Sequence, residues 1–477
     1  MESRGPELIF VFDISVFCFL FSNLRFLFFR VKTTVIFDNF GPYHWARLRA
    51  AARVCELTAV QVAASSAEYA WENEAPADVF KFTTLFQKEM GHDVQQHELV
   101  WKMNQALDDF LPQVVFIPGW SGQAAFAALS WCIRHNVAAV AMSESTEWDA
   151  GRVWWKEWVK RRLVRLCATA FVGGSPHKDY MVKLGMPPER TFLGYDAVDN
   201  GYFGEKAEKL KAEILKKEGR RKYGLPENYF LASARFIEKK NLPRLIQAYA
   251  RYREKAEKLK TETLKSEISA CQNVSVSDFT PWPLVLLGDG PLRSDLCRLI
   301  SDLRLQDSVH LPGFKQYPDL PAYYGLASAF IHASTTEQWG LVVNEAMASG
   351  LPVLVSNRCG CALDLVKDGE NGFTFDPDNV EQLAQLMLKI SALPSPPRSG
   401  RGQGEVSSSN SDPASNISHQ SSSLAQMGDA SRQIIADWGP ERFAQGLQAA
   451  AEKAMAVGPV KPSLLQRMIL KALLCRT

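Results

Sequence analysis

Short apolar runs and helix-like segments alternate along most of the chain, and this alternation limits the possible folds more than any other feature. Runs such as VVFIP at 114–118 and VAAVAM at 137–142 are followed by segments with apolar residues at helical spacing. This succession is typical of an α/β protein with parallel, doubly wound sheets. We predict two such domains, over residues 33–203 and residues 225–455.

The chain is long and nearly neutral. It has 477 residues, a formal net charge of +2 and 46% hydrophobic residues. This length allows about two or three domains, and the weak charge argues against a nucleic-acid-binding protein. The nine cysteines are odd in number and mostly stand in apolar segments, which favours reduced thiols. We predict no metal site, because no Cys or His cluster has zinc-site spacing, and no cofactor.

The run EQWGLVVNEAMASGLPVLVS at 337–356 predicts a loop, a short helix and a strand. Apolar residues recur at helical spacing after Gly340, and Gly350 is a common kind of helix end. The first turn of a helix carries unpaired backbone N–H groups and the positive end of the helix dipole. The candidate phosphate-binding amides are those of Gly340, Leu341 and Val342.

Two glutamates flank this helix start. Glu337 lies in the loop before it, where a carboxylate can accept hydrogen bonds from sugar hydroxyls. Glu345 lies more than one turn inside the helix, and it reaches a ribose if its face lines the cleft. A surface loop acid and an acidic helix residue are the more common explanation of two such residues taken alone.

Basic residues follow the first strand of the second half. The segment LASARFIEKKNLPRLIQAYARYR predicts a strand that ends near Ala234 and then a helix, with Arg235 and Lys240 between them. Two cations at the carboxyl end of a strand can converge on one diphosphate, Arg through a planar fork and Lys as a point charge. Lys239 is an alternative to Lys240 as the relevant amine, and a solvated basic loop is the plainer alternative.

Glycine turns follow two further apolar strands. LVLL at 284–287 leads into Gly288, Asp289 and Gly290, and VHLPG leads into Gly313. Turns of this kind lie between strand and helix in a doubly wound sheet. A single one is a weak signal, because tight turns favour glycine in any fold.

Together, these segments resemble the retaining glycosyltransferases of family 4, in the glycosyl transferases group 1. The resemblance rests on Glu337 and Glu345 with the helix and PV strand that follow, on Arg235 with Lys240, and on the order of the three blocks. It covers roughly residues 33–455 without inserts. It implies the GT-B architecture, an α/β fold of two Rossmann-like, doubly wound domains that face each other across a cleft, with the donor held mainly by the second domain and the acceptor mainly by the first.

The resemblance also implies a reaction. A sugar would move from a nucleotide-diphosphate donor, a UDP- or GDP-sugar, to a glycan, lipid-linked or small-molecule acceptor with retention of anomeric configuration. The implied catalytic residues are Glu337, which orients the sugar, and Arg235 and Lys240, which stabilise the leaving diphosphate. The implied donor-binding residues are Glu345, Gly340, Leu341, Val342, Gly41 and Gly313, with Glu345 on the ribose.

The first half matches the family less closely. A strand, a loop at Gly41 and a helix are expected over TTVIFDNFGPYHWARL, with a single glycine where family members often carry a glycine-rich loop. His44 and Glu144 are candidates for acceptor binding or catalysis, with Glu147 as an alternative to Glu144 for contact with the acceptor. A structural histidine and a plain loop acid are the alternatives. Many relatives place a histidine where this chain has the loop 143–146.

Two other functions are compatible with this architecture. A nucleotide-sugar epimerase would convert the donor without an acceptor, and an inactive protein would bind the sugar nucleotide without turnover. The presence of Glu337, Arg235 and Lys240 argues against the inactive protein, and the family-type glutamate pair argues against the epimerase. Neither the sugar nor the base can be read from these residues.

Several segments lie outside the family pattern. Two near-identical charged segments begin at Glu205 and Glu254 and predict solvated helices. They define a charged linker at 204–224 and an insert near 254–280. A second insert near 394–424 is rich in Ser, Pro and Gly and is expected to be disordered.

The two ends of the chain are apolar. Residues 1–32 form an extension whose apolar run is broken by Asp13 and Arg25, which argues against a clean membrane span. Insertion of residues 8–29 in a membrane and a non-native extension both stay open. Residues 456–477 predict a C-terminal helix.

A further segment favours contact with a membrane. VWWKEWVKRRLVRL at 153–166 combines Trp154, Trp155 and Trp158 with five basic residues. Such a helix can rest on an anionic bilayer surface, and a core helix with a basic outer face is an equal alternative. We predict a cytoplasmic protein, with association at the inner face of the membrane as an additional expectation.

Overall fold

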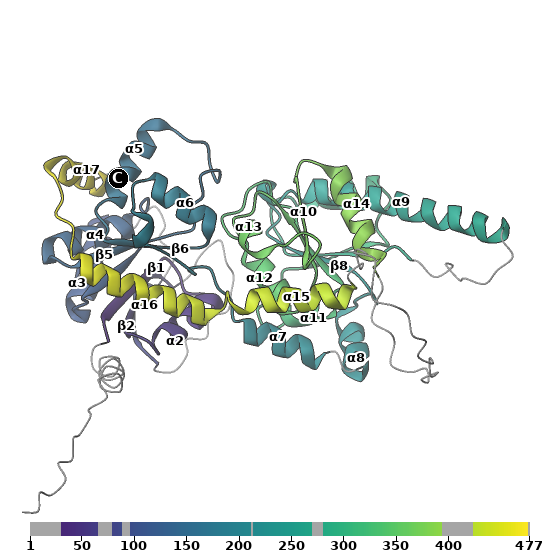
Figure 1. Cartoon of the computed structure of the whole chain (residues 1–477), viewed down its shortest axis with the longest axis horizontal. Coiled ribbons are helices and arrows are strands. Elements are labelled where there is room, and N and C mark those ends of the chain that lie inside the picture. The colour runs from purple at the N-terminus through teal and green to yellow at the C-terminus, as the bar shows by residue number, and fades with distance from the viewer. Residues whose placement is uncertain are drawn as a thin grey trace, which may run out of the picture.

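The computed structural model describes residues 30–64, 79–87, 96–210, 213–269, 280–393 and 423–475. The N-terminal stretch at 1–29 and most of the low-complexity insert, 394–422, lie outside the described residues. Within the described ranges, no helix combines the length and the apolar character needed to cross a membrane. The chain forms two parallel sheets, each with helices around it (Figure 1).

The first domain, at the left of Figure 1, is built on a seven-stranded parallel sheet with the order β3-β2-β1-β4-β5-β6-β7. Its strands are β1 (Lys32–Phe37), β2 (Glu56–Ala63), β3 (Lys81–Phe86), β4 (Val114–Pro118), β5 (Ala138–Ser143), β6 (Thr169–Val172) and β7 (Thr191–Leu193). Successive residues of a strand point to opposite faces. Val35 and Phe37 of β1 lie in one buried cluster and Ile36 lies in another. Both faces of the sheet are therefore buried, as in a doubly wound fold.

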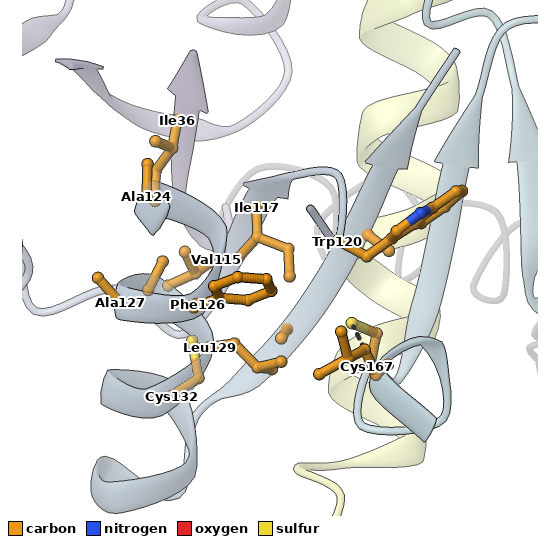
Figure 2. Packing of buried hydrophobic residues seen from close by; sticks show 14 of the residues in the cluster. Ile36, Val115, Ile117, Trp120, Ala124, Phe126, Ala127, Leu129, Cys132 and Cys167 are labelled. Carbon is orange, nitrogen blue, oxygen red and sulfur yellow. Dashed lines mark hydrogen bonds between the residues drawn. The ribbon is translucent and has the colours of Figure 1, made fainter. Parts of the chain in front are cut away.

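Helices pack on both faces of this sheet. They are α2 (Pro42–Ala51), α3 (Gln96–Phe110), α4 (Gln123–His135), α5 (Trp154–Val164) and α6 (Ser175–Lys183). Most of α4 is buried, because this helix packs against the centre of the sheet. Figure 2 shows Phe126 and Leu129 of α4 beside Val115 and Ile117 of β4, and all four side chains are buried.

The second domain contains a six-stranded parallel sheet with the order β10-β9-β8-β11-β12-β13. Its strands are β8 (Phe230–Ser233), β9 (Leu284–Leu287), β10 (Val309–Gly313), β11 (Ala329–His332), β12 (Val353–Ser356) and β13 (Gly372–Phe375). The helices after residue 199 are α7 (Asn200–Lys209), α8 (Glu213–Tyr223), α9 (Leu242–Ser269), α10 (Arg293–Asp302), α11 (Leu320–Leu326), α12 (Leu341–Ala348), α13 (Ala362–Leu365), α14 (Val380–Ser391), α15 (Leu424–Ala436), α16 (Pro440–Val457) and α17 (Leu464–Leu474). The prediction of two doubly wound, parallel sheets is confirmed.

Each sheet reverses its strand order at one place, between β1 and β4 in the first domain and between β8 and β11 in the second. Ligands of open α/β sheets bind outside the carboxyl ends of the strands at such a point. The segment after β8 carries Arg235, and the segment after β11 carries Glu337. Topology alone therefore brings these two predicted residues to one edge of the second sheet.

The last two helices return to the first domain (Figure 1). Phe443 and Leu447 of α16 share a buried cluster with Val35 and Phe116 of the first sheet. The sequence assignment of residues up to 455 to the second domain is therefore wrong for α16. The physical reason is that the apolar side of α16 buries one face of the first sheet. The predicted C-terminal helix is α17.

The two charged repeats are helical, but neither is simply solvated. The first copy lies in α7 and α8, and the second copy lengthens α9. Ala207 and Ala256 occupy the same position of the repeat, and both are buried. Ala207 packs closely on α11, because a Cβ added at Gly325 would lie 2.9 Å from the Cα of Ala207. The segment predicted as a linker thus packs on the second domain.

Candidate functional site

A cavity of about 850 Å³ lies between the two domains, at the carboxyl ends of β8 and β11. Tyr43, Glu144 and Asp196 line it from the first domain. The residues that the sequence predicts for the site and that line this cavity are Glu144, Arg235, Lys240, Glu337, Gly340, Leu341, Val342 and Glu345. The structure thus brings most of the predicted site residues to one cleft.

The segment after β8 presents cations to the cleft. Arg235 lies two residues beyond the end of β8, and Lys240 ends a short 3₁₀ turn. Asn241 holds this turn in place, with a left-handed backbone (φ 57°) and a buried side-chain amide that donates to the carbonyl oxygens of Ala333 (3.0 Å) and Pro377 (2.8 Å). Asn tolerates this conformation better than most residues. Sequence reasoning missed Asn241, although an Asn directly before a predicted helix is a recognisable signal.

Glu337 is an ionised and firmly positioned carboxylate. Its Oε2 accepts a hydrogen bond from Lys240 and lies 3.3 Å from both His332 Nε2 and Ser334 Oγ. Burial raises the pKa of Glu337, but the hydrogen bond with His332 and the charge of Lys240 outweigh burial and hold the pKa well below its ordinary value. His332 was not predicted from the sequence. Its position as a polar residue at the carboxyl end of an apolar strand is the signal that could have indicated it.

The start of α12 is shaped by Gly340. This residue has a left-handed backbone (φ 103°), a conformation that glycine adopts at little cost. The turn directs the chain into α12, and Leu341 and Val342, whose amides belong to the first helical turn, line the cavity. The predicted helix start is confirmed, and the backbone N–H groups of a first helical turn suit an anionic ligand.

The CGC run beside the site is a packing feature. Cys359 and Cys361 are both buried free thiols. Gly360 between them passes so close to the backbone before α12 that an added Cβ would overlap the carbonyl oxygen of Gln338. The amide of Gly360 also donates to the carbonyl oxygen of Glu337 (3.0 Å). The run therefore fixes the backbone that carries Glu337.

Glu345 is fully buried at the junction of the domains. Its Oε1 accepts a hydrogen bond from the hydroxyl of Tyr43 in α2, and its Oε2 has no hydrogen-bond partner among the described residues. Burial raises the pKa of Glu345 to about 7, and the neighbouring hydroxyls of Tyr324 and Tyr43 act in the opposite direction. The carboxyl therefore changes charge close to neutral pH.

A second carboxyl pair lies on the first-domain wall. Asp196 is buried beside Glu144, and neither of its carboxylate oxygens has a hydrogen-bond partner among the described residues. Arg47 Nη2 lies 3.7 Å from Asp196 Oδ1. Burial and then the nearby Glu144 raise the pKa of Asp196, while Arg47 lowers it. Such a pair retains a proton more readily than an isolated carboxylate. No motif pointed to Asp196 in the sequence.

His44 and Gly41 lie outside the cavity lining. The amide of Gly41 donates to His44 Nδ1 (3.0 Å), so the histidine caps the start of α2. Burial and then Arg47 lower the pKa of His44 to about 3, which leaves the ring neutral near pH 7. The same arrangement recurs at α6, where the amide of Gly174 donates to His177 Nδ1 (3.1 Å). The geometry therefore favours the structural explanation of His44.

The glycine turn after β9 lines the cavity, whereas the predicted Gly313 does not. Gly288 has a left-handed backbone (φ +126°), and an added Cβ would overlap the carbonyl oxygen of Ala234. Ala234 directly precedes Arg235, so Gly288 supports the segment that carries a predicted catalytic cation. At Gly313 (φ +84°) an added Cβ would meet nothing within 4 Å.

Residues 215–401, which hold the segment after β8, the α12 start and both glutamates, match the sequence model of Glycosyl transferases group 1. This match places the segment among the glycosyl transferases group 1. The chain is 34% identical over 111 residues to an alpha-monoglucosyldiacylglycerol synthase of Acholeplasma laidlawii. It is 26% identical over 237 residues to an alpha-D-kanosaminyltransferase of Streptomyces kanamyceticus. These alignments cover 23% and 49% of this chain, and 27% and 54% of the respective relatives, so they span about half of those proteins or less.

The fold has close counterparts among solved structures. The crystal structure of Anabaena HepE in complex with UDP and glucose matches with a TM-score of 0.60 at 17% identity, over 87% of this chain and 98% of that chain. At this identity the likeness concerns the fold alone. The group 1 glycosyl transferase segment therefore lies within a GT-B fold of two Rossmann-like domains, as predicted.

Proposed function

We propose that this protein is a retaining glycosyltransferase of family 4. It transfers a sugar from a UDP- or GDP-sugar to a glycan, lipid-linked or small-molecule acceptor. The observation that carries the proposal is the convergence of Arg235, Lys240 and the first turn of α12 around Glu337. Two cations and a set of helix amides suit a diphosphate, and a fixed carboxylate beside them suits sugar hydroxyls.

The proposed reaction needs no protein base. The bond between the anomeric carbon and the diphosphate oxygen breaks, and a bond from the acceptor hydroxyl to the same carbon forms on the same face. The departing diphosphate takes the acceptor proton. Arg235, Lys240 and the amides at Leu341 stabilise the charge that develops on the diphosphate. Glu337 orients the sugar, and Glu345 binds the ribose. No metal or cofactor enters this proposal.

The acceptor side of the proposal rests on the first-domain wall. Glu144 and Asp196 face the cleft opposite the second-domain cations, and carboxyl groups suit hydroxyl donors. The A. laidlawii relative is named as a synthase of monoglucosyldiacylglycerol, which supports a lipid-linked acceptor. The Anabaena structure is a complex with UDP and glucose, which supports a nucleotide-diphosphate donor. We place the enzyme in the cytoplasm, at the inner face of the membrane when the acceptor is lipid-linked.

A thermal-shift screen against UDP, GDP, ADP and their sugar conjugates tests the donor site, because a ligand of the folded state raises apparent stability. A selective shift that disappears in Arg235→Ala supports the proposal, and no shift with any nucleotide contradicts it. Nucleotide-diphosphate release with and without acceptor separates the alternatives. An epimerase converts donor without acceptor, an inactive protein releases nothing, and a retaining transferase forms a product with the donor's anomeric configuration.

A further inference from the structure

Two helices at the outer edge of the first domain expose apolar side chains to solvent. On α5, Trp154 is 80% exposed, and Trp155 and Trp158 are exposed as well. On α17, Leu464 is 77% exposed and Met468 is 62% exposed. Single exposed apolar residues are common on soluble proteins, but clusters of large ones indicate an interaction surface.

The two helices lie side by side. Figure 1 shows α17 at the far left of the first domain, next to α5 at its top. The side-chain amide of Gln466 in α17 donates to the carbonyl oxygen of Arg162 in α5 (3.1 Å). Leu163 and Val164 of α5 and Leu470 of α17 belong to the same buried cluster. The exposed residues therefore stand on one joint structure, although the helices lie some 300 residues apart in the sequence.

Positive charge accompanies these apolar residues. Residues 153–165 carry five Lys and Arg against one Glu, and residues 461–475 carry three Lys and Arg and no acid. The whole chain has a net charge of only +2, so these two segments hold more than its entire net positive charge. The single acid, Glu157, is engaged by Lys160 and Tyr180. The surface thus presents cations without competing free carboxylates of its own.

Cations lie over two of the tryptophan rings. The guanidinium of Arg162 sits 3.7 Å from the ring centroid of Trp158, and Lys156 sits 5.6 Å from that of Trp155. Indole rings favour the headgroup level of a membrane, and nearby Lys and Arg favour anionic lipid phosphates. A bilayer surface accommodates both features at once, because lipid phosphates attract the cations and the headgroup level takes up the indole rings.

We propose that α5 and α17 together form a docking surface for the headgroup region of an anionic lipid bilayer. α17 is thus part of the membrane contact and not only a packing helix. The docking surface is connected to the cleft along the chain. The segment between β5 and α5 begins with Glu144, which lines the cleft. This relation rests on the proposed transfer to a lipid-linked acceptor. The docking itself requires neither substrate.

Co-sedimentation of the full chain with phosphatidylcholine vesicles, with and without phosphatidylglycerol, tests the surface. We expect the protein to pellet only with the anionic vesicles. The double variant Arg161→Glu with Lys471→Glu is expected to weaken this binding by about tenfold or more, because each basic residue near an anionic surface contributes about 1 kcal/mol. The matched control, Lys217→Glu with Arg221→Glu on α8, makes the same charge change on the second domain and is expected to bind normally.

A second pair of variants separates the roles of the helices. Trp154→Ala with Trp158→Ala changes α5, Leu464→Ala with Met468→Ala changes α17, and Leu363→Ala on α13 is an exposed apolar control. We expect weaker vesicle binding from both double variants and not from the control. Binding that depends on α5 alone overturns the joint surface, and no binding to anionic vesicles overturns docking.

Two further readouts keep the outcomes distinct. The first readout is the oligomeric state in solution without vesicles. If the wild type is a dimer and the α17 variant is a monomer, the surface binds a second copy of this chain, and the proposal is wrong. The nucleotide-induced thermal shift is measured on every variant. Retention of this shift together with lost vesicle binding supports a docking role. An absent shift in the wild type contradicts the proposed transferase while the vesicle result still stands.

Discussion

The hydroxyl of Tyr43, in the first turn of α2, donates a hydrogen bond across the domain junction to the carboxyl of Glu345 in α12. Glu345 is the residue that we assign to the donor ribose. The same carboxyl therefore connects the two domains. We propose that ribose hydroxyls and Tyr43 compete for Glu345 Oε1, which would couple the donor site to the junction.

Tyr43→Phe tests this coupling. We expect a lower unfolding temperature without ligand, since a hydrogen bond to a charged or partly charged group contributes about 1.5 to 3 kcal/mol. With saturating UDP, the unfolding temperatures of Tyr43→Phe and wild type should come closer together. The reason is that ribose hydroxyls would replace the tyrosine hydroxyl at Glu345. Thermal shift with and without UDP measures both values. Tyr223→Phe is the control, because its hydroxyl donates to the Asp319 carboxylate (3.2 Å) away from the cavity. If Tyr43→Phe lowers the unfolding temperature by the same amount with and without saturating UDP, the proposed competition is wrong.

Glu345→Gln tests the raised pKa. The pKa of Glu345 is about 7 in the folded protein against an ordinary value of 4.5, so folding favours the protonated form. The stabilising contribution is complete below about pH 4.5 and is lost as the pH rises through about 7. Glutamine stays neutral, so the variant should gain stability relative to wild type as the pH rises, by about 3 kcal/mol in total. Unfolding temperatures of both proteins across this range check the difference, and parallel curves would show that Glu345 is ionised throughout.

Glu337→Gln and Glu337→Ala test the assigned catalytic carboxylate. Loss of a positioned charge at the reacting sugar is expected to lower turnover by about 10²- to 10³-fold. The nucleotide-induced thermal shift should remain, because the diphosphate is held mainly by Arg235, Lys240 and the start of α12. The rate of nucleotide-diphosphate release gives the turnover. Glu238→Gln, an exposed acid in the same turn as Lys240, serves as the control. Near-normal transfer by Glu337→Ala would refute the assignment.

Gly288→Ala tests the support of Arg235. The added methyl group overlaps the carbonyl oxygen of Ala234 and also requires a left-handed backbone, so the segment after β8 must shift. We expect a stability loss of more than about 1 to 3 kcal/mol, the usual cost of such backbone strain alone, together with a smaller UDP-induced shift. Gly313→Ala shares the left-handed backbone without the overlap, and should lose stability but keep its response to UDP. Equal responses of the two variants would contradict a special role for Gly288.

Much of the fold follows from local patterns in the sequence. Strands such as β4 and β9 are short apolar runs bounded by turns, and their parallel pairing follows from the helices between them. The position of α16 does not follow from such patterns. Periodicity shows that this helix has an apolar side, but it does not show which uncovered sheet will bury that side.

The site residues likewise include some that the sequence predicts and some that it does not. Arg235, Lys240, Glu337 and the start of α12 lie in continuous motifs, so the sequence predicts them together. His332 and Asp196 belong to no motif, because their roles arise from residues that come close only after folding. His44 was open to two explanations, and the repeated Gly-x-x-His pattern at α2 and α6 is the signal that favours a helix cap.

The return of α16 and α17 also sets an order of events during synthesis. The strands of the first domain leave the ribosome early, but the sheet face that carries Val35 and Phe116 is buried by Phe443 and Leu447, which are made after the entire second sheet. N-terminal domains generally fold first during synthesis. Here the domain that is made first is completed last, and a nascent chain that stalls before residue 440 leaves an apolar sheet face open to chaperones or to aggregation.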